Sequence, residues 1–269
     1  MRSTFARFTP IATFASLFLA SCSDSGDATT GKRIVLKTSA SGEAVTKTTF
    51  TTGFGWDVIL TKAAIASSGF YYFDGPPPTA MLAPRRRSWG ERFEDLFMKS
   101  AWAHPGHYQA GTALGQVIFA EATTIDLFAP PPSLPAGDGV TGVYRSGRFV
   151  IPQVAPTDPM LAGHVAIAEG RATKHDGTTP TPVFFRLVAD YADISGSINN
   201  GAVDGCVLDE TSVTESGSVN VEIKPTIWLN LVDFSKMDPG TADAPREARN
   251  AGFSQGVTQL SAYHFSYSK

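Results

Sequence analysis

The chain has 269 residues, a hydrophobic fraction of 42% and a formal net charge of −3. This length suffices for one large β domain or two small ones, and this hydrophobic fraction suits a globular protein with a packed core. The one basic run, residues 85–87 (Arg-Arg-Arg), is short. A mildly acidic chain lacks the basic surface that nucleic-acid binding requires, so we exclude nucleic acid as a partner.

The chain begins with the pattern of a secretory signal peptide. Arg2 and Arg7 precede an apolar stretch, residues 11–20, and this order of charge and hydrophobicity is typical of secreted proteins. The stretch is shorter than the run of about 20 apolar residues that crosses a membrane as a helix. Residues 19–22, Leu-Ala-Ser-Cys, resemble the lipobox of bacterial lipoproteins. The resemblance implies that residues 1–21 are a signal peptide and that Cys22 carries lipid.

The residues after Cys22 predict where the protein works. Ser23 follows the cysteine, and the resemblance to Gram-negative lipoproteins then implies sorting to the outer membrane, facing the periplasm or the cell surface. Residues 22–32 are mostly small and polar, which predicts a lipidated flexible tether, since they cannot bury enough apolar surface to fold. An ordinary signal peptide cut elsewhere, or the N-terminal helix of a cytosolic protein, is the alternative interpretation.

Short segments with a period of two dominate the rest of the chain. Residues 218–224 alternate between apolar and polar side chains, and residues 263–267 repeat that pattern, so both predict half-buried strands. Residues 175–178 (His-Asp-Gly-Thr) predict a turn between two further strands, which makes a hairpin. The remaining predicted strands of the chain are 34–38, 45–51, 56–64, 69–73, 116–128, 143–154, 165–173 and 183–189.

One segment has a helical pattern instead. Ser88 and Glu91 form the capping box Ser-x-x-Glu, and apolar residues recur on one helical face up to Phe97, which predicts a short helix near 88–100. A further helical turn is predicted around 227–231. About nine strands and one clear helix predict a mainly β protein, built as a single elaborated antiparallel β-sandwich over residues 33–269.

The strongest functional signal is the sequence His104-Pro105-Gly106-His107. The proline and glycine predict a tight turn, which can aim both imidazoles at one point. Neutral imidazole is the commonest metal ligand and suits zinc and copper. The alternative is that both histidines only form hydrogen bonds in an ordered turn.

Two histidines do not complete a metal site, because zinc takes four ligands or three plus water. The chain has three more histidines, which we rank as a third ligand in the order His164, His264 and His175. A carboxylate ligand would favour zinc, whereas Cys206 or a methionine would favour copper. Our default for Cys206, left without a disulfide partner once Cys22 is lipidated, is burial. The acidic candidates are Asp57, Asp126 and Asp233.

Four segments of the chain are similar to segments of uncharacterised secreted β-rich bacterial proteins, a likeness that carries no established activity. A looser likeness is to periplasmic copper-binding proteins found beside di-haem peroxidase partners. Those proteins have a four-cysteine motif, and only Cys206 could correspond to one of its cysteines here. The four segments are residues 55–61 (Gly-Trp-Asp-Val-Ile-Leu-Thr), 70–73 (Phe-Tyr-Tyr-Phe), 103–107 (Ala-His-Pro-Gly-His) and 228–234 (Trp-Leu-Asn-Leu-Val-Asp-Phe).

One motif misleads. Residues 252–256 (Gly-Phe-Ser-Gln-Gly) match the Gly-x-Ser-x-Gly pattern of serine hydrolases, in which a strand leads by a sharp turn into a helix and an acid and a histidine follow. No Asp or Glu follows residue 256, and residues 237–250 are too polar for a buried strand. We interpret the match as chance.

These observations leave three hypotheses. In the first, a lipid-anchored envelope protein binds zinc or copper through His104, His107 and His164, for acquisition, storage or delivery, without turnover. In the second, it recognises an envelope protein or a glycan through Trp102 and the aromatic residues 70–73; their burial would count against this. In the third, it is a metal-dependent enzyme with an open coordination position.

Overall fold

The structure is a computed structural model that describes residues 31–78, 111–174, 181–238 and 240–269. These residues are mainly β, and their strands form one mixed sheet of 12 strands. The predicted antiparallel sandwich is not confirmed, because β1–β10, β8–β11 and β9–β12 pair in parallel. The strands are β1 (Arg33–Gly42), β2 (Phe50–Thr51), β3 (Trp56–Phe73), β4 (Ala113–Asp126), β5 (Gly137–Val140), β6 (Gly142–Val150), β7 (Ala166–Lys174), β8 (Val183–Ala189), β9 (Ala202–Val213), β10 (Gly217–Ile223), β11 (Arg246–Arg249) and β12 (Tyr263–Ser268).

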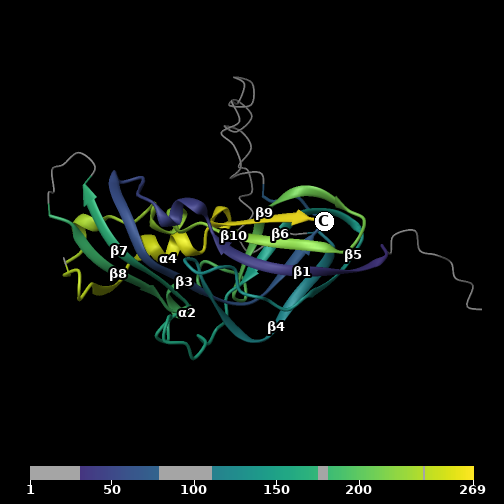
Figure 1. Ribbon diagram of the computed structural model, residues 1–269, viewed down its shortest axis with the longest axis horizontal. Helices are drawn as coiled ribbons and strands as arrows, with labels where there is room; N and C mark the ends of the chain where they lie inside the picture. The colour runs from purple at the N-terminus through teal and green to yellow at the C-terminus, as the bar shows by residue number, and fades with distance from the viewer. Residues whose placement is uncertain (1–30, 79–110, 175–180, 239) are drawn as a thin grey trace, which may run out of the picture. The chain divides into compact units, whose positions relative to one another are not determined.

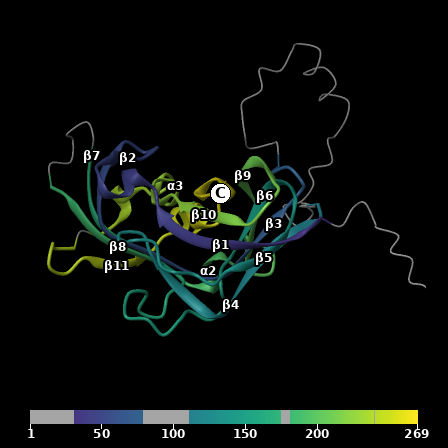
Figure 2. The ribbon, with the colours of Figure 1, turned by 45° about the vertical axis from the view of Figure 1, so that its right-hand side comes forward.

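Eight of these strands close into a ring. They pair in the order β3-β4-β5-β1-β10-β12-β9-β6, and β6 pairs back with β3. Two contacts around the ring are short, since β4–β5 and β9–β12 each consist of two residue pairs. In Figures 1 and 2, the ring strands β1, β5 and β6 lie towards the right of the view, and β7 and β8 lie together towards the left.

The long strand β3 belongs to both parts of the sheet. Its first half, from Trp56 to Ile65, pairs with β7, from which the sheet continues to β8 and β11. Its last residues pair with β4 and β6 inside the ring. The two parts meet at a register shift after Ser67, where Gly69 has a φ of +152°. A Cβ at Gly69 would lie 2.4 Å from the Val117 carbonyl oxygen, so the bend requires glycine.

Aromatic side chains fill the ring. Phe70 is fully buried, and its ring centroid lies 5.4 Å from that of Phe119 and 5.3 Å from that of Phe149. Phe265, from β12, reaches Phe70 across the ring at 6.0 Å. Such edge-on and tilted pairs contribute beyond their buried area. The alternation of β3 directs Phe70 and Tyr72 to this interior.

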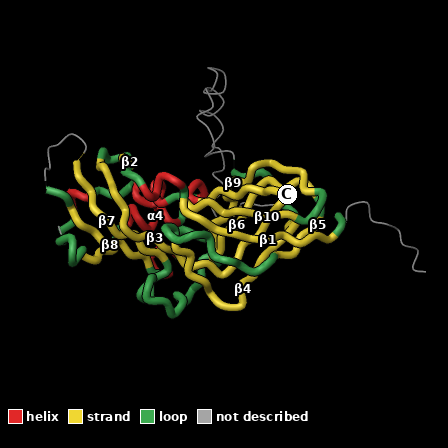
Figure 3. Tube along the Cα trace, in the orientation of Figure 1, coloured by secondary structure: helices red, strands yellow, loops and turns green. Residues whose placement is uncertain are grey.

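Helical segments are short and lie beside the β7–β8 part of the sheet, where Figure 3 shows them in red. The longest, α4, contacts α2, α3 and β8. No helix in the described ranges has the length and apolarity to cross a membrane. The α-helices are α2 (Tyr191–Ile194), α3 (Pro225–Leu229) and α4 (Ala251–Val257), and the 3-10 helices are η1 (Ala44–Lys47), η4 (Phe234–Lys236) and η5 (Leu260–Ala262).

Most predicted strands exist, with shifted ends. The predicted hairpin is confirmed by the antiparallel pairing of β7 with β8, although its turn, residues 175–178, lies outside the described residues. The predicted strand 45–51 is wrong in its first half, where η1 stands. The predicted strands 56–64 and 69–73 are one strand. The predicted helix near 88–100 lies outside the described residues.

Candidate functional site

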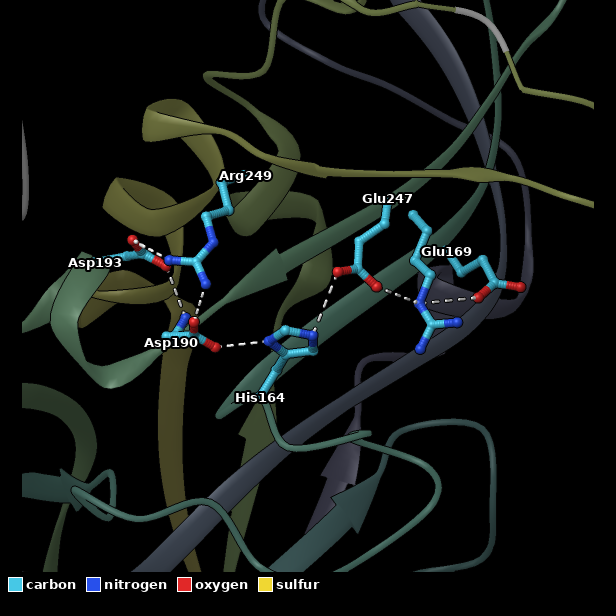
Figure 4. A network of polar contacts seen from close by, with 7 residues as sticks. His164, Glu169, Asp190, Asp193, Glu247 and Arg249 are labelled. Atoms are coloured by element: carbon cyan, nitrogen blue, oxygen red, sulfur yellow. Dashed lines mark hydrogen bonds and ion pairs between the residues drawn. The ribbon is translucent and has the colours of Figure 1, made fainter.

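A cluster of charged side chains surrounds His164, just before β7 (Figure 4). Its Nδ1 lies 2.6 Å from the Asp190 Oδ1, and its Nε2 lies 3.6 Å from the Glu247 Oε1. The pairing of β7 with β8 explains the first contact, because the Val165 amide donates to the Ala189 carbonyl and so places the neighbouring residues side by side. The His164 side chain is only 15% exposed.

Arg249 ties the same cluster to α2. Its guanidinium contacts the Asp190 carboxylate, and its Nη1 lies 3.3 Å from the Asp193 Oδ1. The other Asp193 oxygen accepts a hydrogen bond of 2.8 Å from the Asp190 amide, which closes the first turn of α2. Two carboxylates therefore share one guanidinium at the end of β11.

A second row of charges crosses the sheet beside His164. Glu169 on β7 lies directly opposite Arg186 on β8, which in turn lies opposite Glu247 on β11. The Arg186 Nε lies 3.5 Å from Glu247 and 4.0 Å from Glu169. Opposite charges in register on one face stabilise neighbouring strands, so the row helps to hold the short strand β11 to the sheet.

A cavity of about 440 Å³ adjoins the cluster, lined by Asp193 and Arg249 and by residues of α4. Ser254 lines it and is 8% exposed. Its Oγ makes no hydrogen bond to any described residue, whereas its backbone is bonded within the helix. Asn250 also lines the cavity, and its Oδ1 accepts from the Phe253 amide, so its side-chain N–H groups remain as donors.

The glycines of the hydrolase-like motif serve packing. A Cβ at Gly252 would lie 2.1 Å from the Leu231 carbonyl oxygen, and one at Gly256 would lie 2.4 Å from that of Trp228. Glycine at both positions therefore lets α4 approach α3 and the residues that follow it. One residue separates β11 from α4, but Ser254 lies within α4 rather than in the turn between them, which is where a nucleophile of this type would stand.

His104 and His107 lie outside the described residues, as does Cys22. The structure does describe both ends of the segment that carries the two histidines. It leaves β3 after Phe73, which pairs with Ala113 at the start of β4. The Asp74 Oδ1 accepts a hydrogen bond of 2.6 Å from the Thr112 amide. The two ends of the segment are therefore held side by side on neighbouring strands.

His164, the predicted third ligand, lies beside the middle of β3 rather than near its end at Phe73. The Ala66 amide donates to the Val165 carbonyl, whereas β3 ends at Phe73, which precedes the segment with His104 and His107 in the chain. At about 3.3 Å per residue, these two points of β3 are separated by about 23 Å. Both ring nitrogens of His164 face carboxylates, and the part of the chain that is described holds no group of three His, Cys, Asp or Glu residues suited to a metal ion.

The other candidate ligands have local partners. Asp57 accepts from the Thr51 hydroxyl at 2.6 Å, and Asp126 from the Phe128 amide at 2.9 Å. A hydrogen bond from the Ser235 hydroxyl lowers the pKa of Asp233. The His264 Nε2 lies 2.9 Å from the Asp209 Oδ1. His175 lies outside the described residues.

Cys206 is fully buried, as predicted, and burial raises the pKa of its thiol. The aromatic residues proposed as a recognition surface are also mostly buried, since Phe70 and Tyr72 are inaccessible and Phe73 is 6% exposed. An outward aromatic surface at residues 70–73 is therefore confined to the half-buried Tyr71. Trp102 lies outside the described residues.

The chain matches no family model, no curated protein and no solved structure. The sequence reasoning identified His164 but missed its partners. The pair Asp190 and Asp193 directly after a predicted strand is a recognisable helix start, which was a usable signal. The contribution of β11 was not predictable, because its pairing with β8 is parallel and joins residues about 60 positions apart.

Proposed function

We propose that the protein is a lipid-anchored protein of the cell envelope that binds zinc or copper through His104 and His107, for acquisition, storage or delivery of the metal. The observation that carries the proposal is the sequence His-Pro-Gly-His in a segment whose two ends are held together by β3 and β4. Holding both ends restricts the conformations of a connection, which lowers the entropy that ligand binding must overcome.

The chemistry of the pair supports a borderline metal rather than a hard one. Imidazole nitrogen suits zinc and copper, whereas calcium and magnesium prefer oxygen ligands. We leave His164 out of the proposed pair because both of its ring nitrogens already face carboxylates. Its predicted role as third ligand becomes a separate arm of the test.

Calorimetric titration of the soluble chain that begins at Ser23 tests the metal proposal. Zinc and copper are titrated separately into wild type and into the double variant His104→Ala/His107→Ala. The proposal expects binding by wild type and none by the double variant. Equal binding by both proteins would refute it.

Two single variants complete that titration. His264→Gln is the matched control, since this histidine pairs with Asp209 on the ring, and its affinity should equal that of wild type. His164→Gln tests the third ligand. Unchanged affinity in this variant would restrict His164 to the charged cluster, and weakened affinity would restore it to the ligand set.

Lipidation at Cys22 is tested separately by mass spectrometry of protein extracted from membranes. The proposal expects a mature chain that begins at Cys22 with a mass increase corresponding to diacylglycerol and an acyl chain. A Cys22→Ser variant should lose both the lipid and the membrane association. Recovery of an unlipidated chain with a different N-terminus would refute the anchor without bearing on metal binding.

A further inference from the structure

The cavity between α2 and α4 has a polar wall that includes a serine hydroxyl. Ser254 is 8% exposed, lines the cavity and makes no side-chain hydrogen bond to the described residues. Its hydroxyl can therefore donate to or accept from a bound ligand without breaking a hydrogen bond within the described chain. This serine is thus the starting point for a binding site.

The free groups around Ser254 are mainly hydrogen-bond donors. Arg249 uses one N–H of each terminal nitrogen on Asp190 and Asp193, so further N–H groups remain. The Asn250 side chain offers its amide N–H groups, because its oxygen caps α4. Ser197 and Gln255 at the rim add an exposed hydroxyl and an exposed amide. A ligand for this wall needs several oxygen acceptors in a small volume.

The charges of the cluster decide which acceptors fit. Asp190 and Asp193 carry two negative charges against the single positive charge of Arg249, so the wall has no excess positive charge for an anion. Both oxygens of Asp193 are also engaged, by Arg249 and by the Asp190 amide, which leaves them weak partners for an added cation. Hydroxyl and ether oxygens satisfy donors without adding charge.

We propose that this cavity binds a neutral saccharide, with the Ser254 hydroxyl and the Arg249 and Asn250 N–H groups directed at sugar oxygens. The cavity of about 440 Å³ falls within the usual range of small-molecule sites. The site is independent of His104 and His107, so it adds a second binding function to the proposed metal binding. Without an aromatic platform, its affinity is in the millimolar range, as expected for a few exposed hydrogen bonds.

Hydrogen–deuterium exchange of the full chain, in a detergent without a sugar head group, tests the proposal. Glucose at tens of millimolar should slow exchange of the amides of residues 250–257, and glucuronate, which differs by a carboxylate, should slow it less. Maltotriose forms a third arm: stronger protection than with glucose identifies a unit of a glycan chain, and equal protection identifies a free sugar. Glucuronate protecting at least as well as glucose would overturn the proposal, and so would unprotected amides with every sugar.

Two serine variants distinguish an effect of the Ser254 hydroxyl on glucose binding from an effect on folding. Ser254→Ala should weaken glucose binding about fivefold, the value of one hydrogen bond, without lowering stability, because no partner in the described chain loses a bond. Ser212→Ala is the matched control, since this exposed serine lies on β9, and it should bind like wild type. Unchanged glucose affinity in a folded Ser254→Ala protein would show that this serine does not contact the sugar, and would refute the proposed site.

Discussion

Inside the ring of eight strands, the side chains are aromatic and aliphatic and pack directly against one another, whereas the face of β7, β8 and β11 carries a row of opposite charges. In the ring interior, Phe70 contacts both Phe149 and Phe265. The charged face holds His164 between two carboxylates and borders a polar cavity. One continuous strand, β3, connects these two environments.

We infer from this difference that the ring interior provides most of the stability, whereas the charged face provides the groups that can bind a ligand. A close-packed and mostly apolar interior leaves little room to admit a ligand. A face of partly exposed charges contributes little to stability, but it supplies hydrogen-bond donors and acceptors at the surface. We therefore expect substitutions in the ring to change the free energy of unfolding, and substitutions at the α2–α4 cavity to change binding.

The largest expected effect is in the ring. Replacing Phe70 with alanine should lower the free energy of unfolding by about 3–5 kcal/mol, because a fully buried ring leaves a cavity that its neighbours cannot close. Denaturant unfolding followed by tryptophan fluorescence measures the change. The matched control is Phe54→Ala, whose side chain is 49% exposed and which should cost less than about 0.5 kcal/mol. Similar costs for the two variants would contradict a packed ring interior.

The next effect concerns the two residue types of the hydrolase-like motif. Gly256→Ala should destabilise by about 1–3 kcal/mol, because the new Cβ would lie 2.4 Å from the Trp228 carbonyl oxygen. In an exposed helix the same change would stabilise by about 1 kcal/mol, so the sign of the effect is diagnostic. Ser254→Ala should stay within about 0.5 kcal/mol of wild type. A stabilising Gly256→Ala would show that α4 does not approach α3 closely.

A smaller effect is expected from the charged cluster. A double-mutant cycle of Asp190→Ala and Arg249→Ala should give a coupling energy of about 0.5–1 kcal/mol, since both side chains are partly exposed. The control cycle uses Arg246 and Asp238, which lie 3.1 Å apart but whose carboxylate is far more exposed than that of Asp190, and its coupling should be smaller. Additive effects of the two substitutions would show that the ion pair between Asp190 and Arg249 contributes no coupling energy.

The last effect is a dependence of stability on alkaline pH. Burial raises the pKa of Tyr144 to about 12 from the ordinary value of 10.0. The unfolded chain releases this proton at lower pH than the folded chain, so stability is complete below pH 10.0 and falls as the pH rises towards about 12. Tyr144→Phe should lose stability at neutral pH, because the hydroxyl donates to the Val140 carbonyl at 2.8 Å. Its stability should nevertheless fall less steeply in alkali, and an equal slope would contradict the burial of this hydroxyl.

The parts of the fold that follow from local pattern were predictable. Alternation located β10 and β12, and the Gly-containing turn located the β7–β8 hairpin, because both signals lie within a few neighbouring residues. Ring closure was not predictable, since it depends on β3 pairing with both β4 and β6 through a bend at Gly69. The short strand β5 was missed because its sequence, Gly-Asp-Gly-Val, has no strand-forming pattern.

The candidate site shows the same limit. His164 is visible in the sequence as one of five histidines, but its partners Asp190 and Glu247 come from a neighbouring strand end and from β11. Only the three-dimensional pairing of β7, β8 and β11 brings these residues together. The packing role of the glycines around Ser254 could not be predicted from the sequence, because it depends on the contact of α4 with Trp228.

We propose that the sheet is a scaffold and that the connection from β3 to β4 carries a metal site. Elemental analysis of the protein purified from its own membranes tests it most directly. The claim predicts zinc or copper in an amount comparable to the protein in wild type, and its loss in His104→Ala/His107→Ala. Wild-type protein without a transition metal, or equal metal content in both proteins, would contradict it.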